Sequence, residues 1–347
     1  MKSINEAFEE ICLKHKYIRP VNRASDALYI ILKKIQTKSK KIAISEICCH
    51  DILAAVIEAG WEPFLVDISP KRGSPSIKSY RAAIHQGCSV ILVTNLYGNP
   101  ENIKQLSQLC AENKVEVIED LAQSLGAKVR NKLLGTFGKH VIISFGKTKQ
   151  FPIGNGLLMT NNEEIFDYAK AFTIDKFSLV ETPKFRKSYF VAQKKLFETN
   201  SFDSFKNIHK EIKIKKIKYD LPKVKTFKQN LKKFKNELSL RRERFLTLKE
   251  ILEKKGFNIG LLKEGAIPWR LNCWYGNRNY LESKEISDNL RKKNIRVSHW
   301  YIPLSAFLSG DKISCEGAKM FNKGLIQFWL DKRAEEKEYN LLNKIIM

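Results

Sequence analysis

Residues 115–160 read VEVIEDLAQSLGAKVRNKLLGTFGKHVIISFGKTKQFPIGNGLLMT and contain two runs with the character of buried strands, 115–120 and 141–145. Polar side chains stand at or after the end of each run, namely Asp120, Gln123, Ser144 and Lys149. Burying a carboxylate at the end of a strand costs free energy unless a cation pairs with it. We therefore interpret the acid and the amine as parts of one site that binds a charged ligand.

The residues before this stretch alternate between strand and helix patterns. Strands are predicted at 41–47, 63–68, 88–98 and 115–120, and helices at 22–36, 51–60, 76–87 and 99–114. The strands are almost continuously apolar, which is typical of a parallel sheet with helices on both faces. Ligand sites in such sheets collect at the carboxyl ends of strands, where this chain carries Asp67, Tyr97, Asp120 and Ser144. The sequence therefore predicts an α/β fold with a site at that edge.

The pattern loosens after residue 160. A helix is predicted at 163–172, and a lysine-rich, irregular segment at 180–225, in which 212–218 is either an edge strand or a basic loop. A long charged helix then connects to a second domain. The connecting helix is predicted at 226–256, and the second domain has a strand at 267–275, a helix at 283–294, a strand at 295–304 and a closing amphipathic helix.

Composition limits the classes of function. The 347 residues carry a net charge of +25, spread over many lysines, and contain no apolar run long enough to span a membrane. The N-terminus lacks the apolar core of a signal peptide, so a cytoplasmic location is expected. Seven scattered cysteines without a C-x-x-C pair indicate neither a metal site nor a disulfide framework. The charge suits an anionic partner, but no aromatic and basic module indicates nucleic acid as the main ligand.

The polar groups of the central stretch suit a phosphorylated aromatic cofactor. Asp120 could pair with a pyridinium nitrogen, Gln123 could hydrogen-bond a ring oxygen, and Lys149 could form a Schiff base with an aldehyde. Ser144 and the N-terminal end of the helix at 22–36 could bind a phosphate. Each feature also has a structural interpretation: a turn or cap for Asp120, a solvated side chain for Lys149 and an ordinary N-cap for the helix.

Seven short motifs in collinear order resemble those of the DegT/DnrJ/EryC1/StrS family of sugar aminotransferases. They are ASDAL at 24–28 (family G-T-x-A-L), PFLVDI at 63–68 (P-V-F-V-D-V), LYGNP at 96–100 (L-Y-G-x-P), EDLAQ at 119–123 (E-D-x-A-Q), SFGKTK at 144–149 (S-F-x-x-T-K), GNGL at 154–157 (G-E-G-G) and NIRVSHWYIP at 294–303 (G-I-x-x-x-x-H/W-Y-x-P). Each motif is weak alone, but together they cover most of the chain.

The resemblance implies the aspartate-aminotransferase fold, fold type I of the pyridoxal-phosphate enzymes. A large domain over 1–235, with a mostly parallel sheet covered by helices, would bind the cofactor, and a smaller α+β domain would span 236–347. The implied cofactor is pyridoxal 5′-phosphate, and Lys149 is the implied catalytic residue that holds it. Lys147 is an alternative for that role.

The resemblance also implies roles for other residues. The implied cofactor contacts are Asp120 for the ring nitrogen, Gln123 for the ring hydroxyl, Ser144, Ser25 and Ala24 for the phosphate, and Cys49 or else His50 for the ring face. Trp300 and Tyr301 are the implied substrate-binding residues. The family is typically homodimeric, with each site completed by the partner subunit.

The implied reaction transfers an amino group from glutamate or glutamine to a nucleotide-linked keto-sugar, for a surface polysaccharide, lipopolysaccharide or related glycoconjugate. Three family residues are replaced, by Ala24, Cys49 and Leu157, and the N-Y-R-M segment has no clear match near Tyr219. These departures motivate a second hypothesis, a degenerate member that acts as a binding or regulatory subunit. A branch of sugar dehydratases carries histidine in place of the lysine, which Lys149 argues against. A nucleic-acid-binding protein is motivated by net charge alone.

Overall fold

The computed structural model describes residues 15–221, 224–312, 315–330 and 342. Its large sheet has seven strands, in the order β1 (Tyr17–Val21), β9 (Gly156–Thr160), β8 (His140–Ser144), β5 (Glu116–Asp120), β4 (Val90–Thr94), β2 (Lys41–Ser45) and β3 (Glu62–Val66). Only β9 runs antiparallel to its neighbours, β1 and β8. The mostly parallel sheet and the α/β class are therefore as predicted.

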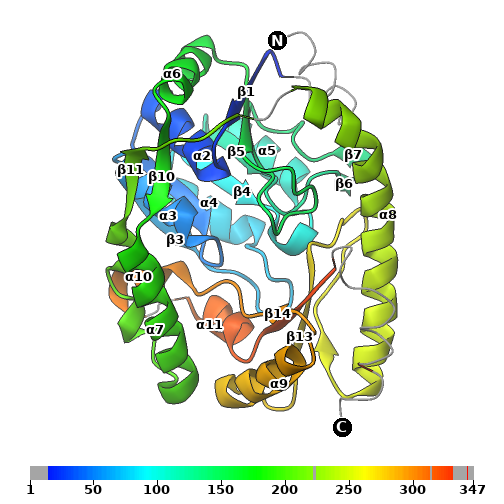
Figure 1. Cartoon of the computed structure of the whole chain (residues 1–347). Helices are drawn as coiled ribbons and strands as arrows, with labels where there is room; N and C mark the ends of the chain where they lie inside the picture. The colour runs from blue at the N-terminus through cyan, green and yellow to red at the C-terminus, as the bar shows by residue number, and fades with distance from the viewer. Residues whose placement is uncertain (1–14, 222–223, 313–314, 331–341, 343–347) are drawn as a thin grey trace.

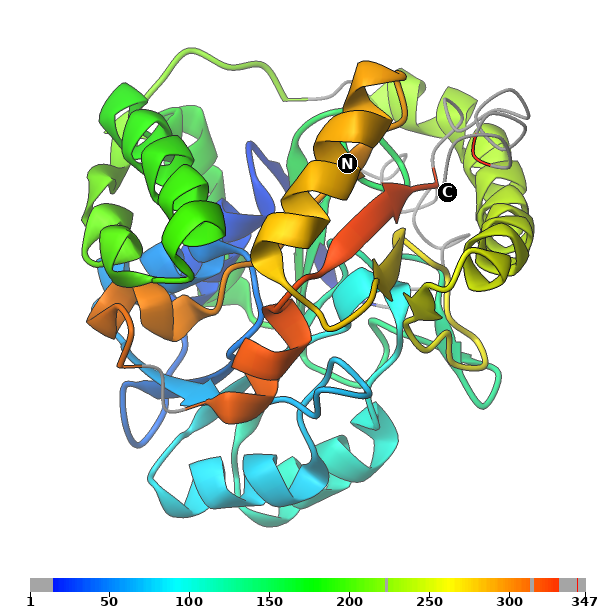
Figure 2. The same ribbon diagram turned by 90° about the horizontal axis from the view of Figure 1, so that it is seen from below.

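Alternate residues along the central strands enter two separate cores, because successive side chains of a strand point to opposite faces. Ile42, Leu92 and Ile118 belong to the first core, beneath α2 (Ala24–Lys34), α3 (His50–Glu58) and α6 (Glu163–Ile174). Ala43 and Val93 belong to the second, beneath α4 (Ile77–His85) and α5 (Ile103–Glu112). Figure 2 shows α4 and α5, in light blue and cyan, as a layer along one side of the molecule.

The strand predicted at 88–98 ends early, at Thr94, and is followed by the 3-10 turn η1 (Leu96–Gly98). Gly98 has φ +88°, and a Cβ there would lie 1.8 Å from the carbonyl oxygen of Ile267. The amide of Ile267 in turn donates to the Gly98 oxygen at 3.1 Å. The chain turns at this point because the start of the second domain passes directly against it.

The prediction of an irregular segment over 180–225 was wrong. Strands β10 (Phe177–Glu181) and β11 (Ile212–Lys216) form an antiparallel pair, which resolves 212–218 as a strand. Between them the chain forms α7 (Pro183–Thr199) and the 3-10 turns η2 (Asp203–Phe205) and η3 (Ile208–Glu211). Figure 1 shows α7, in green, across the molecule from the long helix α8 (Val224–Lys254).

The second sheet has four antiparallel strands, in the order β12 (Asn258–Ile259), β13 (Arg270–Trp274), β15 (Ile326–Trp329) and β14 (Val297–Ser298). Helices α9 (Tyr280–Lys292), α10 (Leu304–Ser309) and α11 (Glu316–Asn322) accompany it, which gives the expected α+β character. The strand predicted at 295–304 was too long. It ends at Ser298, because the chain then turns toward the large domain, where Pro303 pairs with Ile47.

The structure does not test two further predictions, the domain boundary and the closing helix. The predicted domain boundary at 235 falls within α8, so the division stays a prediction. The closing amphipathic helix falls mostly on residues outside the described ranges. Short strands β6 (Lys128–Val129) and β7 (Lys132–Leu133) complete the described elements. Within those ranges, no helix has the length and apolar character that crossing a bilayer requires.

Candidate active site

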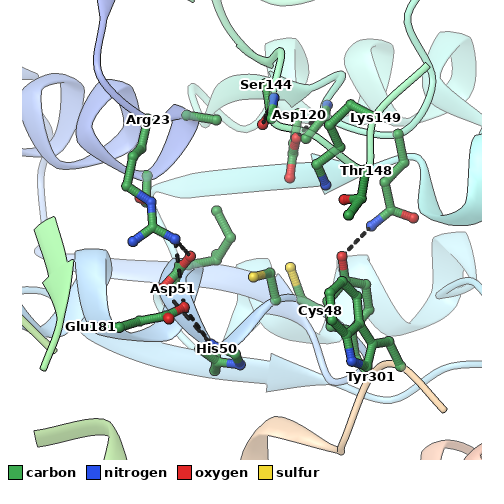
Figure 3. A pocket seen from close by; sticks show the side chains of 18 of the residues that line it. Arg23, Cys48, His50, Asp51, Asp120, Ser144, Thr148, Lys149, Glu181 and Tyr301 are labelled. Carbon is green, nitrogen blue, oxygen red and sulfur yellow. Dashed lines mark hydrogen bonds and ion pairs between the residues drawn. The ribbon is translucent and has the colours of Figure 1, made fainter. Parts of the chain in front are cut away.

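A cavity of about 590 Å³ opens where the carboxyl ends of β5 and β8 meet the N-terminal ends of α2 and α3. Its lining includes every site residue predicted from the sequence: Ala24, Ser25, Cys49, Asp120, Gln123, Ser144, Lys149, Trp300 and Tyr301. Figure 3 shows Asp120, Ser144 and Lys149 together on one side of this cavity, across from Asp51 and His50.

Glu119 and Asp120 are adjacent on β5 and therefore face opposite sides of the strand. Glu119 points away from the cavity and accepts backbone amides from Gly135, Phe137 and Gly138 at 2.6–2.7 Å. Asp120 lines the cavity with only 4% of its surface exposed. Burial raises the pKa of the Asp120 carboxyl to about 6, against the opposing effects of an amide hydrogen bond and of Lys149. A cationic ligand would relieve this cost.

Lys149 follows β8 in a tight turn, in which its amide donates to the Gly146 oxygen at 2.9 Å. Its Nζ lies 4.8 Å from the centre of the Trp269 ring. The Trp269 indole donates to the Thr148 oxygen at 2.6 Å and so fixes the loop. Burial lowers the pKa of the Lys149 amine, which favours the neutral, nucleophilic form. Lys147 is exposed and does not line the cavity, so the geometry favours Lys149 over its alternative.

The end of the cavity beside α2 has the features of a phosphate cradle. The first amides of a helix lack intrahelical partners and point outward. Ser25, in the first turn of α2, has a buried hydroxyl that finds no hydrogen-bond partner among the residues that the structure describes. A Cβ on Gly156 would lie 2.7 Å from the Ala24 nitrogen, so glycine lets β9 approach this turn. Ser144 contributes a second hydroxyl to the lining. These groups fit the phosphate of the expected cofactor.

Gln123 links the cavity to Tyr301, which follows β14. Its Oε1 accepts the Tyr97 amide at 2.7 Å, and its Nε2 donates to the Tyr301 hydroxyl at 3.1 Å. The Tyr97 hydroxyl donates to the Trp300 oxygen at 2.8 Å. Tyr301 also packs in parallel on the Trp269 ring, with 6.2 Å between the ring centres. The motifs around Tyr97, Gln123 and Tyr301 therefore form one connected set of contacts.

Two positions singled out in the sequence have other contacts in the fold. Asp67 lies outside the cavity lining and accepts the amides of Gly317 and Ala318 at the start of α11, both at 2.9 Å. Leu157, which replaces a family glycine, is fully buried in the second core. Both residues therefore have structural roles, and the departure at Leu157 does not alter the cavity.

Sequence reasoning missed an ionic cluster on the cavity wall. Arg23 pairs with Asp51 and lies 3.6 Å from Glu181, and His50 lies 3.2 Å from Glu181. The His50 hydrogen bond and Arg23 lower the pKa of Glu181 to about 2. Donor atoms of Cys49, His50 and Asp51 lie within 4.8 Å of one another. The Arg23 guanidinium already supplies a positive charge beside the Asp51 and Glu181 carboxylates. We therefore interpret the cluster as a set of ion pairs and not as a metal site.

The ring-facing position predicted at Cys49 lies on the cavity wall, at the N-cap of α3. His50, the alternative, also borders the cavity, but its ring packs against Phe185 and Tyr189 of α7, with 4.8 and 5.2 Å between ring centres. The geometry therefore favours Cys49 for the ring face. Sequence reasoning also missed the contribution of α7, although apolar residues at 185, 189, 192 and 196 repeat with helical spacing.

The model of the DegT/DnrJ/EryC1/StrS aminotransferase family matches residues 1–308. The chain belongs to this family. Its sequence is 24% identical over 154 residues to GDP-perosamine synthase of Vibrio cholerae, an alignment that covers 44% of this chain and 42% of the relative. The chain thus spans less than half the length of the curated relatives it matches, for which the next two alignments cover 42% and 41%.

Solved structures of this family share the fold across the whole chain. PseC of Helicobacter pylori, an aminotransferase involved in the biosynthesis of pseudoaminic acid, has a TM-score of 0.76 at 17% identity, covering 100% of this chain and 90% of that one. An Escherichia coli GDP-4-keto-6-deoxy-D-mannose-3-dehydratase with bound hydrated PLP has a TM-score of 0.74 at 16% identity, covering 99% and 92%. The predictions of the family, the fold and, at the level of the family, pyridoxal phosphate as the cofactor are confirmed.

Proposed function

We propose that this chain is a pyridoxal-phosphate-dependent aminotransferase that moves an amino group from glutamate or glutamine to a nucleotide-linked keto-sugar. One observation carries the proposal. The buried carboxylate of Asp120 and the partly buried amine of Lys149 lie on the same wall of the cavity. The unpartnered Ser25 hydroxyl lies at a helix N-terminus on the same cavity. Family membership and the similarity to GDP-perosamine synthase and to the aminotransferase PseC support the same reaction class.

When bound, the cofactor supplies an aldehyde that receives the amino group and a ring that withdraws electrons. In our proposal, Lys149 is the residue that would hold the cofactor covalently, and its amine would carry the proton that amino transfer requires. Burial lowers the pKa of this amine, which favours the neutral form that both tasks require. The Asp120 carboxylate would hold the proton on the ring nitrogen, and this pairing would offset the cost of burying the carboxylate.

The remaining contacts fix the orientation of the ring. Ser25, Ser144 and the first amides of α2, including that of Ala24, would bind the phosphate. Gln123 and Cys49 also line the cavity, and they would contact the ring oxygen and one face of the ring, respectively. Cysteine offers less contact area than an aromatic residue, so we expect cofactor binding that depends strongly on the phosphate cradle.

The product would enter a surface polysaccharide or a related glycoconjugate. Trp300 and Tyr301 border the cavity from the second domain and would contact the substrates. A homodimer and a cytoplasmic location belong to the same proposal.

The test is a titration of the purified protein, followed by absorption. We expect a yellow protein whose spectrum changes when glutamate or glutamine is added and returns when a nucleotide keto-sugar is supplied. A colourless protein that ignores added pyridoxal phosphate would contradict the proposal. Bound cofactor that responds to no amino donor would favour a binding or regulatory subunit. Loss of water from the sugar without amino transfer would favour a dehydratase.

A further inference from the structure

One wall of the cavity is formed by α7, the helix inserted between the two strands of the β10–β11 pair. Five of its side chains line the cavity: Phe185, Arg186, Tyr189, Phe190 and Gln193. Members of this set lie three or four positions apart, which is about one helical turn, so they form a single stripe along the helix. The stripe belongs to the same chain as the Lys149 wall, and no contact with a second subunit is needed to place it.

The helix is anchored firmly enough to act as a recognition surface. At its start, Thr182 caps the amide of Phe185 at 3.1 Å. The Tyr189 ring stacks on Phe307, with 6.3 Å between the ring centres. Toward its end, the Phe197 ring packs against His299 at 4.8 Å, which ties the helix to the second domain. These contacts fix the helix backbone that carries the cavity-facing side chains before a ligand arrives.

Arg186 differs from the other cations of the cavity wall. Arg23 forms an ion pair with Asp51, and the Lys149 amine interacts electrostatically with the Asp120 carboxylate. Among the described residues, Arg186 has no carboxylate partner within ion-pairing distance, and its Nη2 donates to the backbone oxygen of Glu181 at 3.3 Å. Its side chain is exposed at the cavity. A guanidinium in this state remains available to pair with a phosphate.

Phe190 lies one turn beyond Arg186 and is 69% exposed, although it borders the cavity. A large aromatic side chain left uncovered beside a free guanidinium suits a ligand that combines an anion with a flat or apolar surface. A nucleoside diphosphate has both features. Gln193, one turn further, adds an amide that can donate and accept hydrogen bonds.

We propose that α7 is the recognition wall for the nucleoside-diphosphate part of the acceptor. Arg186 pairs with the diphosphate, and Phe190 packs against the nucleoside. This inference rests on the proposed function and deepens it, because it assigns acceptor binding to a helix that the cofactor wall does not use. Donor and acceptor recognition would then depend on different parts of the chain.

The experiment titrates UDP, GDP and dTDP separately into the cofactor-loaded protein and measures binding by calorimetry. Arg186→Ala should weaken the best-bound nucleotide about 10- to 100-fold, because a charge-assisted hydrogen bond is lost. Lys187→Ala is the matched control, since Lys187 is an equally charged, exposed neighbour outside the cavity lining, and it should change affinity less than about twofold. Arg186→Lys should fall between the two.

Phe190→Ala should weaken binding about 3- to 30-fold, and its control Val191→Ala, exposed but outside the lining, should change it less than about twofold. Equal losses in the Arg186 and Lys187 variants, or no binding of any of the three nucleotides, would overturn the inference. So would a change in molecular mass on Phe190→Ala by light scattering, which would make α7 a subunit interface. Failure of the proposed function would appear separately, as a spectrum that no amino donor changes in the same wild-type sample.

Discussion

The wall formed by β5 and β8 and the wall formed by α7 border the same cavity but are built differently. The first takes its functional side chains from the last residues of two buried strands and from the turns that follow them. The second takes them from one face of a helix inserted into a β-hairpin. In the first wall, the strand itself sets the position of each side chain. In the second wall, the position of the helix is set by its packing on residues such as His50 and Phe307.

This difference suggests a division of labour. A group that must hold a reactive cofactor benefits from a rigid sheet edge, where Asp120 and Lys149 keep their positions. A group that selects the acceptor lies on an element that can differ without disturbing the sheet. Changes in the first wall should therefore affect the spectrum and both half-reactions, and changes in the second should affect acceptor binding more than the donor step.

The largest effect is expected for Lys149→Ala. It removes the amine that would hold the cofactor and move the proton, so amino transfer should fall about 10⁴-fold or more and the yellow colour should disappear. Steady-state transfer rates and absorption spectra measure both effects. Lys147→Ala is the control, since this exposed lysine lies outside the cavity lining. If Lys147→Ala abolished the colour and Lys149→Ala kept it, the assignment of the first wall would be reversed.

Asp120→Asn should lower the rate of amino transfer about 10²- to 10³-fold, because the ring nitrogen loses a charged partner that is 4% exposed. The rate of the donor half-reaction, followed by stopped-flow absorption, measures the loss. Glu119→Gln is the matched control. That side chain points away and holds three backbone amides, so its variant should lose stability but keep the donor spectrum. Equal kinetic losses in both variants would contradict the separate roles of these adjacent acids.

The cofactor-free protein should show the cost of burying Asp120. A carboxyl whose pKa is raised to about 6 contributes stability below its unfolded value near 4 and loses that contribution as pH rises through 6. At pH 7.5, the free energy of unfolding of Asp120→Asn should therefore be up to about 3 kcal/mol higher than that of the wild type, so the variant should be the more stable protein. Denaturant unfolding at pH 4 and pH 7.5 measures the difference, which should nearly vanish at the lower pH. A difference independent of pH would show that Asp120 is not strained by burial.

The smallest effect is expected for Gln193→Ala on α7. Loss of one neutral hydrogen bond should raise the KM for the acceptor about 2- to 10-fold. The rate of the donor half-reaction should change less than the acceptor KM. Kinetics with each substrate varied in turn measure the two values. A larger effect on the donor step than on the acceptor KM would erase the distinction between the two walls.

The sequence predicted the first wall well because its signals are local. Continuous apolar strands located Asp120 and Ser144 at strand ends, and collinear motifs added Lys149 and Gln123. It did not predict α7, because lysines dilute the helical spacing of Phe185, Tyr189 and Leu196, and only packing across the chain shows which face meets the cavity. The Arg23 cluster was missed for the same reason, since its partners lie 28 and 158 residues away.

Reduction with borohydride, followed by peptide mass spectrometry, tests the central claim most directly. The reagent fixes a Schiff base between pyridoxal phosphate and the lysine that holds it, so the modified residue can be read from the peptide. We predict that the modification lies on Lys149, on the β8 side of the cavity. Modification of Lys147, or no modified lysine after reduction of protein saturated with pyridoxal phosphate, would contradict the account.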